Sequence, residues 1–249
     1  MSERLHELDK IFVEVSAGSE NASRETRKRF WKLVRQIKRN PRPDHDEIVK
    51  ASEIRNILFK VDRGGTVPLI PALAIEFLLG TFVALWGYLW LLGFPLDWSG
   101  ILSWTLNDWG LFSLRMLCVM GVVALYYPFG RLIAGKWAGI RFDGMCKDQY
   151  YEPTLKIDYV SFLHAPAPKR KWFFFFAGIW TILTALVVGV IGLIIAQDYT
   201  SFIPVILLLI FEGAAVRSGK PSDNYGEMGH YNREKRIERV WKKNLAAIE

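Results

Sequence analysis

Four stretches of the chain are almost free of charge, while charged residues are dense in the segments between them. The stretches run over 67–94, 111–133, 172–197 and 202–216. A helix needs ~20 mostly apolar residues to cross ~30 Å of hydrocarbon, and the first three stretches meet that length. The fourth is shorter and contains Glu212. A buried or re-entrant helix is therefore the alternative to a fourth crossing.

Basic residues are confined to alternate segments of this pattern. Segments 1–66, 131–171 and 217–249 hold 15, 8 and 8 lysines and arginines, which is 31 of the 32 in the chain. Four crossings place all three segments on one side of the membrane, and the positive-inside rule makes that side cytoplasmic. The sequence therefore predicts an all-α polytopic protein with four transmembrane helices and both termini in the cytoplasm.

The overall composition hides this pattern, because 51% hydrophobic and 23% charged residues would also suit a soluble domain. The clustering of the charges excludes a simple soluble globule and a disordered chain. Cys118 and Cys146 are the only cysteines among 249 residues, which excludes a secreted disulfide scaffold. We expect an integral protein of a plasma or inner membrane.

The polar segments also contain predicted elements. Apolar residues at helical spacing predict helices over 4–15, 22–39 and 48–59, and Asp44 and Glu47 have the spacing of a capping box before the third. The expected domains are 1–66, a helical basic cytoplasmic domain; 67–135, transmembrane helices 1 and 2; 136–171, a cytoplasmic insert with a short strand at 155–159; 172–216, transmembrane helices 3 and 4; and 217–249, a helical cytoplasmic tail.

The predicted helix 22–39 surrounds an apolar stripe with eight cations. These are Arg24, Arg27, Lys28, Arg29, Lys32, Arg35, Lys38 and Arg39. Such a helix before a membrane span is able to lie on an anionic lipid surface, and a solvated face of a small helical domain is the alternative. Nucleic-acid binding is not expected, because acidic residues reduce the net charge of segment 1–66 to +4.

Catalytic signals are few. No HExxH, GxSxG, GxGxxG or Walker motif occurs. Glu227, His230 and Glu234 share one helical face and are weak candidates for metal ligands. No second group completes such a site, so we expect neither a metal nor another cofactor.

The charges inside the apolar stretches are the stronger candidates, because charged groups in a membrane need partners. Glu76 lies in the first stretch, and Arg115 lies near the outer end of the second, from where it would reach outward to water. Arg131 and Glu212 lie at the cytoplasmic ends of the second and fourth stretches. We expect these two residues to form an intramembrane polar pair.

Spans two to four resemble the membrane core of site-2 proteases, the intramembrane zinc metalloproteases. The resemblance rests on the run Tyr127-Pro128-Phe129-Gly130-Arg131 at the motif position, a following strand at 155–159, Ala177-Gly178 in span three and Glu212-Gly213 in span four. In the motif, Tyr127, Pro128 and Arg131 stand at the positions of the first histidine, the glutamate and the second histidine. The resemblance therefore implies a degenerate core without the zinc site.

We expect a non-catalytic protein that acts as a structural or interaction subunit, such as a pseudo-protease-like scaffold. Its expected partners are anionic membrane lipids and other membrane or cytosolic proteins. One alternative is an intramembrane enzyme or transporter that uses Glu76, Glu212 and Arg131. A second alternative is a protein that binds anionic lipid through the basic helix.

Overall fold

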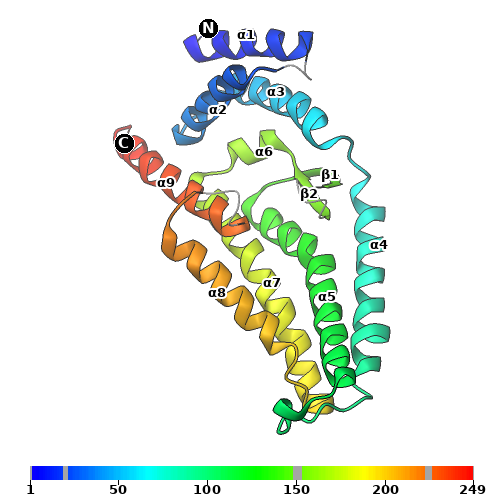
Figure 1. Cartoon of the computed structure of the whole chain (residues 1–249). Helices are drawn as coiled ribbons and strands as arrows, with labels where there is room; N and C mark the ends of the chain where they lie inside the picture. Colours follow the sequence, from blue (N-terminus) through cyan, green and yellow to red (C-terminus); the bar gives the residue numbers. More distant parts are fainter. Residues whose placement is uncertain (1, 19–21, 148–152, 222–225, 249) are drawn as a thin grey trace.

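A bundle of long apolar helices bears a group of polar helices at one end (Figure 1). The computed structural model describes residues 2–18, 22–147, 153–221 and 226–248. Its helices are α1 (Glu3–Ala17), α2 (Arg24–Arg39), α3 (His45–Arg63), α4 (Leu69–Phe82), the π-helix η2 (Val83–Leu89), the 3-10 turn η3 (Ile101–Ser103), α5 (Leu106–Ala138), α6 (Tyr159–His164), α7 (Ala167–Ala196), α8 (Phe202–Ser218) and α9 (Gly226–Ala246).

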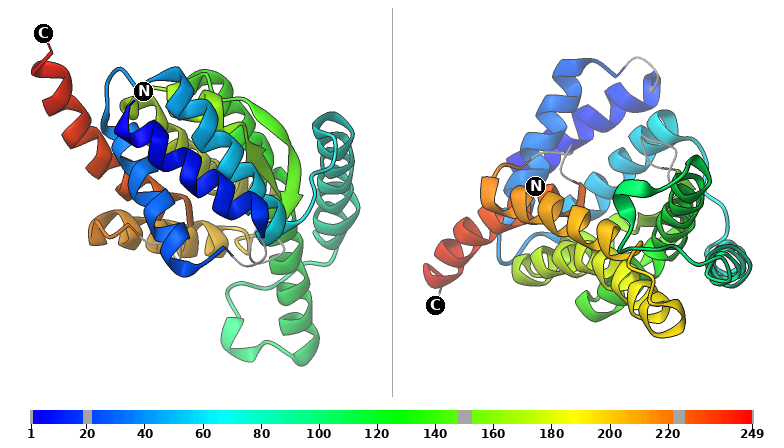
Figure 2. Two further views of the ribbon diagram at one scale, coloured as in Figure 1. Left: turned by 90° about the horizontal axis from the view of Figure 1, so that it is seen from above. Right: turned by 60° about the horizontal axis from the view of Figure 1, so that its bottom comes forward.

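Three helices are long and apolar enough to cross a membrane. They are Leu69–Leu89, Leu106–Ala138 and Ala167–Ala196, with mean hydropathies of 2.0, 1.7 and 2.6. This confirms the prediction of a mostly helical, integral membrane protein. The fourth predicted span forms α8, which has 17 residues and returns along α7 (Figure 1). Helix α4 continues directly into η2 and stands at the edge of the bundle (Figure 2).

The helices of the polar end begin close to the predicted positions, because side-chain caps satisfy their first backbone N–H groups. Ser23 caps α2, and Asp44 caps α3 by accepting from the backbone N–H of Asp46. The other half of the predicted capping box does not form. The Glu47 carboxylate instead binds the side chains of Ser2 and Arg4, which ties α3 to the start of α1.

A two-stranded antiparallel hairpin lies between α5 and α7. Strand β1 (Phe142–Lys147) pairs with β2 (Pro153–Ile157), which lies at the predicted strand. The linker before α4 joins the hairpin, because Val67 and Met145 exchange both backbone hydrogen bonds, at 2.9 and 3.0 Å. The polar insert therefore also fixes the point at which the chain enters its first apolar helix.

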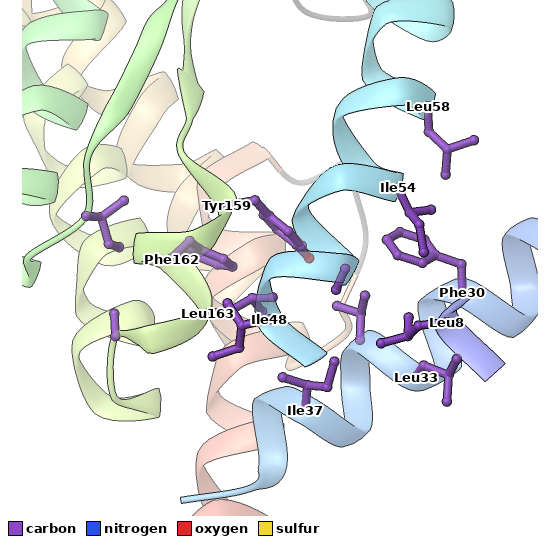
Figure 3. Close-up of a cluster of buried hydrophobic side chains, with 14 of the residues drawn as sticks. Leu8, Phe30, Leu33, Ile37, Ile48, Ile54, Leu58, Tyr159, Phe162 and Leu163 are labelled. Carbon is purple, nitrogen blue, oxygen red and sulfur yellow. The ribbon is translucent and has the colours of Figure 1, made fainter. Parts of the chain in front are cut away.

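One hydrophobic core joins the N-terminal helices to the bundle (Figure 3). Phe30 and Ile37 of α2, together with Ile54 of α3, belong to the same buried cluster as Phe162 of α6 and Phe173 of α7. Burial of such side chains contributes roughly 1.5–3 kcal/mol each. The polar end is therefore packed on the bundle as part of one core.

Close approach of α5 and α7 stabilises the centre of the bundle. A Cβ atom on Gly130 of α5 would lie 2.3 Å from the Trp180 ring of α7, so the absence of a side chain makes room for the indole. The Trp180 Nε1–H donates to the Tyr126 carbonyl at 2.9 Å. Small residues commonly allow such contacts between membrane helices.

Candidate functional site

A cavity of about 950 Å³ lies where the polar helices meet the bundle. Its walls come from α2, α3, α6, β2 and α9, and its floor comes from α5, α7 and α8. This volume lies at the upper end of the usual range for ligand pockets, ~300–1,000 Å³. A second hollow, of about 850 Å³, lies near α1 among the described residues.

The lining of the cavity is strongly basic. Among the residues that the structure describes, ten lysines and arginines line it, against two carboxylates, Asp62 and Glu227. The cations are Arg24, Arg27, Lys28, Arg35, Lys38, Arg55, Arg63, Arg131, Lys156 and Arg233. Walls that carry one sign of charge concentrate the field inside a cleft and attract ligands of the opposite charge. The site is therefore built for an anion.

Protein carboxylates neutralise only part of this charge. Arg27 pairs with Asp62 at 2.7 Å and Lys156 with Asp143 at 3.1 Å. Lys38 and Arg131 also have acidic partners. Within the described ranges, five of the lining cations have no carboxylate at ion-pair distance: Arg24, Lys28, Arg35, Arg55 and Arg63.

Arg55 is the most enclosed of these five cations. Its guanidinium carbon lies 5.0 Å from the ring centroids of both Phe59 and Tyr159. The nearest hydrogen-bond acceptor is the Ile157 carbonyl, at 3.5 Å. Burial lowers the pKa of Arg55, and the neighbouring Arg63 adds to this effect. A guanidinium keeps its proton in a protein, so Arg55 places an uncompensated charge beside the cavity.

Helix α2 buries an apolar stripe in the core and presents a basic face to the cavity, and Val34 belongs to both. Phe30, Leu33, Val34 and Ile37 are buried in the protein core. The apolar stripe of the predicted lipid-surface helix is therefore covered by protein. Arg24, Arg27, Lys28, Trp31, Arg35 and Lys38 instead line the cavity at helical spacing.

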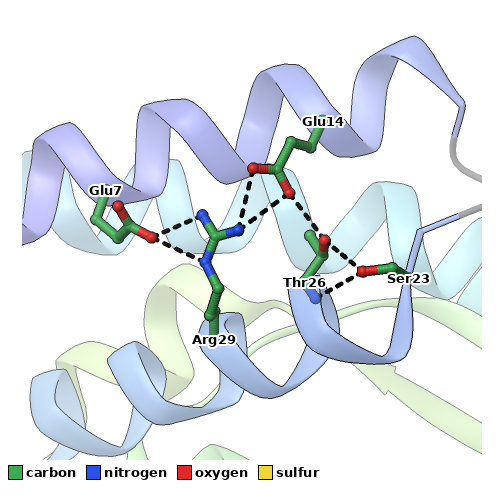
Figure 4. A network of polar contacts seen from close by, with 5 residues as sticks. All are labelled: Glu7, Glu14, Ser23, Thr26 and Arg29. Atoms are coloured by element: carbon green, nitrogen blue, oxygen red, sulfur yellow. Dashed lines mark hydrogen bonds and ion pairs between the residues drawn. The ribbon is translucent and has the colours of Figure 1, made fainter.

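The other predicted basic residues of α2 have different roles. Arg29 is held between two carboxylates of α1, with Nη2 2.7 Å from Glu7 and Nη1 3.1 Å from Glu14 (Figure 4). Thr26 donates to Glu14 at 2.8 Å. Lys32 and Arg39 line a separate, shallower hollow near α1. Arg29 thus joins α2 to α1 and does not line the basic cavity.

A buried ion cluster closes one side of the cavity. Lys38 Nζ lies 2.6 Å from Oε1 of Glu234 in α9, and Arg170 Nε of α7 lies 3.0 Å from Oε2. Arg170 also donates to the Lys38 carbonyl at 2.8 Å. Burial lowers the pKa of Lys38 to about 8, against the attraction of Glu234. Burial raises the pKa of Glu234, but Lys38 and Arg170 outweigh it and hold the pKa at about 2.

The predicted pair of Arg131 and Glu212 is wrong. Arg131 Nε lies 2.9 Å from Oε1 of Glu227, and Nη1 donates to Thr154 at 2.6 Å. Tyr127 donates to the same Glu227 carboxylate. Helix α9 packs against both α7 and α8, which brings Glu227 to the position expected for Glu212. The Glu212 Oε2 atom is buried without a hydrogen-bond partner.

The three weak metal candidates face different partners. Glu227 binds Arg131, while Glu234 binds Lys38 and Arg170. Burial lowers the pKa of His230 well below its usual value, and the neighbouring cations lower it further. The described residues contain no group of three or more metal-ligating side chains of the His, Cys, Asp and Glu types. Their shared helical face therefore serves ion pairing.

Arg115 does not reach outward to water. It is 1% exposed, and its Nη1 lies 2.6 Å from Oδ1 of Asp198, in the loop between α7 and α8. Its Nη2 donates to the Leu91 carbonyl at 2.9 Å. Tyr88 donates to Asp198 Oδ2 at 2.8 Å and accepts from Ser201 at 2.8 Å.

This sealed cluster involves two local features of the helices. Tyr88 belongs to the π-helical segment η2, in which the wider turn changes the direction of the side chains. A Cβ atom on Gly192 of α7 would lie 2.1 Å from the Tyr88 hydroxyl, so only glycine leaves room for it. Apart from the buried Arg115 Nε, which has no hydrogen-bond partner among the described residues, these groups bind one another, and the cluster has the character of a structural clamp.

Glu76, the remaining predicted intramembrane charge, is isolated. Its side chain is on α4, 6% exposed, and no ion pair joins it to another described residue. Its Oε2 atom has no hydrogen-bond partner. Glu76, Glu212 and Arg131 therefore do not converge as an enzyme or transporter centre among the described residues.

Sequence reasoning missed Arg55 and Asp198. Arg55 follows an apolar helix pattern and resembles any solvated cation, although Arg55, Phe59 and Arg63 recur at intervals of four on one helical face. Asp198 is a lone acid between two apolar stretches. The sequence signal for the pairing of Asp198 with Arg115 was a single arginine in span two and a single acid in the next outer loop.

Comparison with known proteins found no matching family model, no similar curated protein and no similar solved structure.

Proposed function

We propose that the protein is a non-catalytic integral membrane protein that binds an anionic, phosphate-bearing group in the basic cavity. The observation that carries the proposal is the imbalance, among the described residues, of ten lining cations and two lining carboxylates around Arg55, which has no carboxylate at ion-pair distance. Phosphate oxygens accept the parallel hydrogen bonds that guanidinium groups offer. The proposal keeps the expected non-catalytic character and makes the bound anion the partner.

Binding of inorganic pyrophosphate to the full chain, purified in an uncharged detergent, tests this function. Calorimetry is expected to detect binding that weakens as salt rises, because the attraction is electrostatic. Arg55→Gln should weaken binding about tenfold, as loss of a charged hydrogen bond does. Arg42→Gln is the matched control, because Arg42 is exposed and outside the lining. Equal binding by both variants, or none by the native chain, would contradict the proposal.

Four crossings with both termini in the cytoplasm form part of the proposal. Helix α8 is ~26 Å long at ~1.5 Å per residue, close to the hydrocarbon thickness. The contact between α2 and α9 also supports an even number, since it joins the two polar ends of the chain. Single cysteines at exposed Leu102 and Lys169, in a chain without its native cysteines, should react with impermeant reagent from opposite sides.

The resemblance to a degenerate site-2 protease core also remains a proposal. It is supported by the hairpin between α5 and α7 and by the place of Glu212 on the last apolar helix. Arg131, at the second histidine position, is bound to Glu227 and Thr154, so a cation stands where zinc-binding members of the family have a metal ligand. Retention of stoichiometric zinc by the purified protein would overturn this proposal.

A further inference from the structure

The basic cavity has two chemically different zones. Cations of α2 and α3 line the part next to the polar helices. The floor toward the bundle carries the aromatic rings of Tyr127, Phe174 and Phe211 beside the ion pair of Arg131 and Glu227. A small soluble anion satisfies only the first zone, whereas the second fits an apolar group.

The aromatic floor lies well inside the apolar helices. Tyr127 precedes the end of α5 at Ala138 by 11 residues, and Phe211 precedes the end of α8 at Ser218 by seven. At ~1.5 Å per residue these residues lie ~16 Å and ~10 Å along their helices. The cavity therefore extends from the polar helices into the region of the apolar stretches 111–133 and 202–216.

Phe211 marks a place where the cavity meets the outer surface of the bundle. Its side chain lines the cavity and is also 46% exposed. Ile210 and Leu207 on the same helix are 64% and 56% exposed. An apolar outer surface of this kind faces lipid in a membrane-spanning helix. Phe211 therefore belongs both to the cavity lining and to the apolar outer surface of α8.

Resting on the proposed anion binding, we propose that the occupant of the cavity is a phospholipid with an exposed phosphate. Its phosphate is bound by Arg55 and the neighbouring cations of α2 and α3. Its acyl chain passes Phe211 on α8 and continues into the bilayer. The basic zone of the cavity then contacts the phosphate, and the aromatic zone contacts the acyl chain.

Native mass spectrometry of the full chain in an uncharged detergent tests this inference. Phosphatidic acid and phosphatidylcholine are the lipid probes, and glycerol 3-phosphate is the soluble probe with the same phosphate. We expect phosphatidic acid to bind at least about tenfold tighter than glycerol 3-phosphate, because only the lipid buries apolar surface on the floor. Phosphatidylcholine should bind more weakly, because its headgroup carries a cation.

Two variants separate the contributions of head and chain. Arg55→Gln should weaken both phosphate probes about tenfold. Phe211→Ser should weaken phosphatidic acid several-fold and leave glycerol 3-phosphate unchanged, because the ring contacts the chain alone. Arg42→Gln and Ile210→Ser are the matched controls, exposed and outside the lining. Arg63→Gln, an exposed lining cation, replaces Arg55→Gln should the latter not fold.

The outcomes distinguish the two proposals. Equal affinity for phosphatidic acid and glycerol 3-phosphate, both sensitive to Arg55→Gln, would overturn the lipid occupant and leave anion binding intact. Binding of phosphatidic acid that ignores both Arg55→Gln and Phe211→Ser would show attachment elsewhere and overturn the site. Absence of binding by either probe would contradict both proposals.

Discussion

Arg115 and Asp198 form a buried ion pair across 83 residues of sequence, with 2.6 Å between Nη1 and Oδ1. The pair joins α5 to the loop at which α7 turns into α8. Both side chains are at most 1% exposed, so removal of one partner leaves the other charge without compensation. The relationship makes this end of the bundle sensitive to single substitutions.

Asp198→Asn is expected to destabilise the protein by about 3 kcal/mol, because breaking a buried pair from one side leaves an unpaired charge. The measurement is thermal unfolding in detergent, followed by circular dichroism. The double variant Arg115→Leu with Asp198→Leu should recover part of the loss, since it removes both charges. Asp97→Asn, an exposed carboxylate at the same end, is the control. A double variant as unstable as the sum of its single variants would exclude the coupling.

Gly192→Ala is expected to lower stability by about 1–3 kcal/mol, because the new methyl group would overlap the Tyr88 hydroxyl. Combining it with Tyr88→Phe should restore part of the loss by making space. Gly213→Ala is the control, since nothing lies within 4 Å of its added Cβ and alanine favours a helix. Melting temperatures of the three variants measure the effect. Equal responses at Gly192 and Gly213 would contradict the packing argument.

The Glu234 carboxylate is expected to make stability depend on acid pH. Its pKa is held at about 2 in the folded chain, against an ordinary 4.5. Because the folded pKa is the lower one, its contribution is complete above about 4.5 and is lost as pH falls toward 2. The loss attributable to this group is up to roughly 3 kcal/mol. Unfolding between pH 2 and 5 measures it.

Glu234→Gln should flatten this part of the pH profile, while exposed Glu25→Gln should leave its shape unchanged. The variant is also expected to be less stable at pH 7, because Lys38 and Arg170 would both lose their acidic partner. An unaltered slope below pH 4.5 in Glu234→Gln would show that other carboxylates govern acid unfolding.

Cys146 reports the electric field of the cavity, because its buried thiol lies in the lining. Burial raises the pKa of this thiol, so its reactions at neutral pH are slow. In a Cys118→Ala background, an anionic methanethiosulfonate should react about tenfold faster than a cationic one at low salt. The difference should shrink at high salt through screening. Labelling rates followed by mass spectrometry measure the ratio, and a faster cationic reagent would contradict a basic cavity.

The periodic parts of the fold were predictable from local sequence. The three long apolar helices and the cap at Asp44 follow from composition and spacing over a few turns. Strand β1 was not predicted, because Asp143 and Gly144 disfavour a strand and its pairing with β2 decides the structure. Local sequence patterns thus identified helices and one strand, but they did not identify which elements pack or pair with one another.

The partners of buried charges were the least predictable feature. Glu212 lies inside the fourth apolar stretch and Glu227 lies in the charged tail that follows it, and nothing in their local sequence indicates which one meets Arg131. The answer depends on how α9 crosses the ends of the bundle. The cavity was missed for the same reason, because its walls come from segments that are far apart in the chain.

The shared core also sets a problem of timing during synthesis. Lys38 is synthesised 132 residues before Arg170 and 196 residues before Glu234, the two residues that bind it in the folded chain. At ~5–20 residues per second, the interval between synthesis of Lys38 and synthesis of Glu234 is roughly 10–40 s. Until α6 and α7 have been synthesised, the faces of α2 and α3 that belong to the same core lack these two helices to pack against. A ribosome-bound chaperone that shields these faces would then matter more for the yield of this protein than any contact made within its first sixty residues.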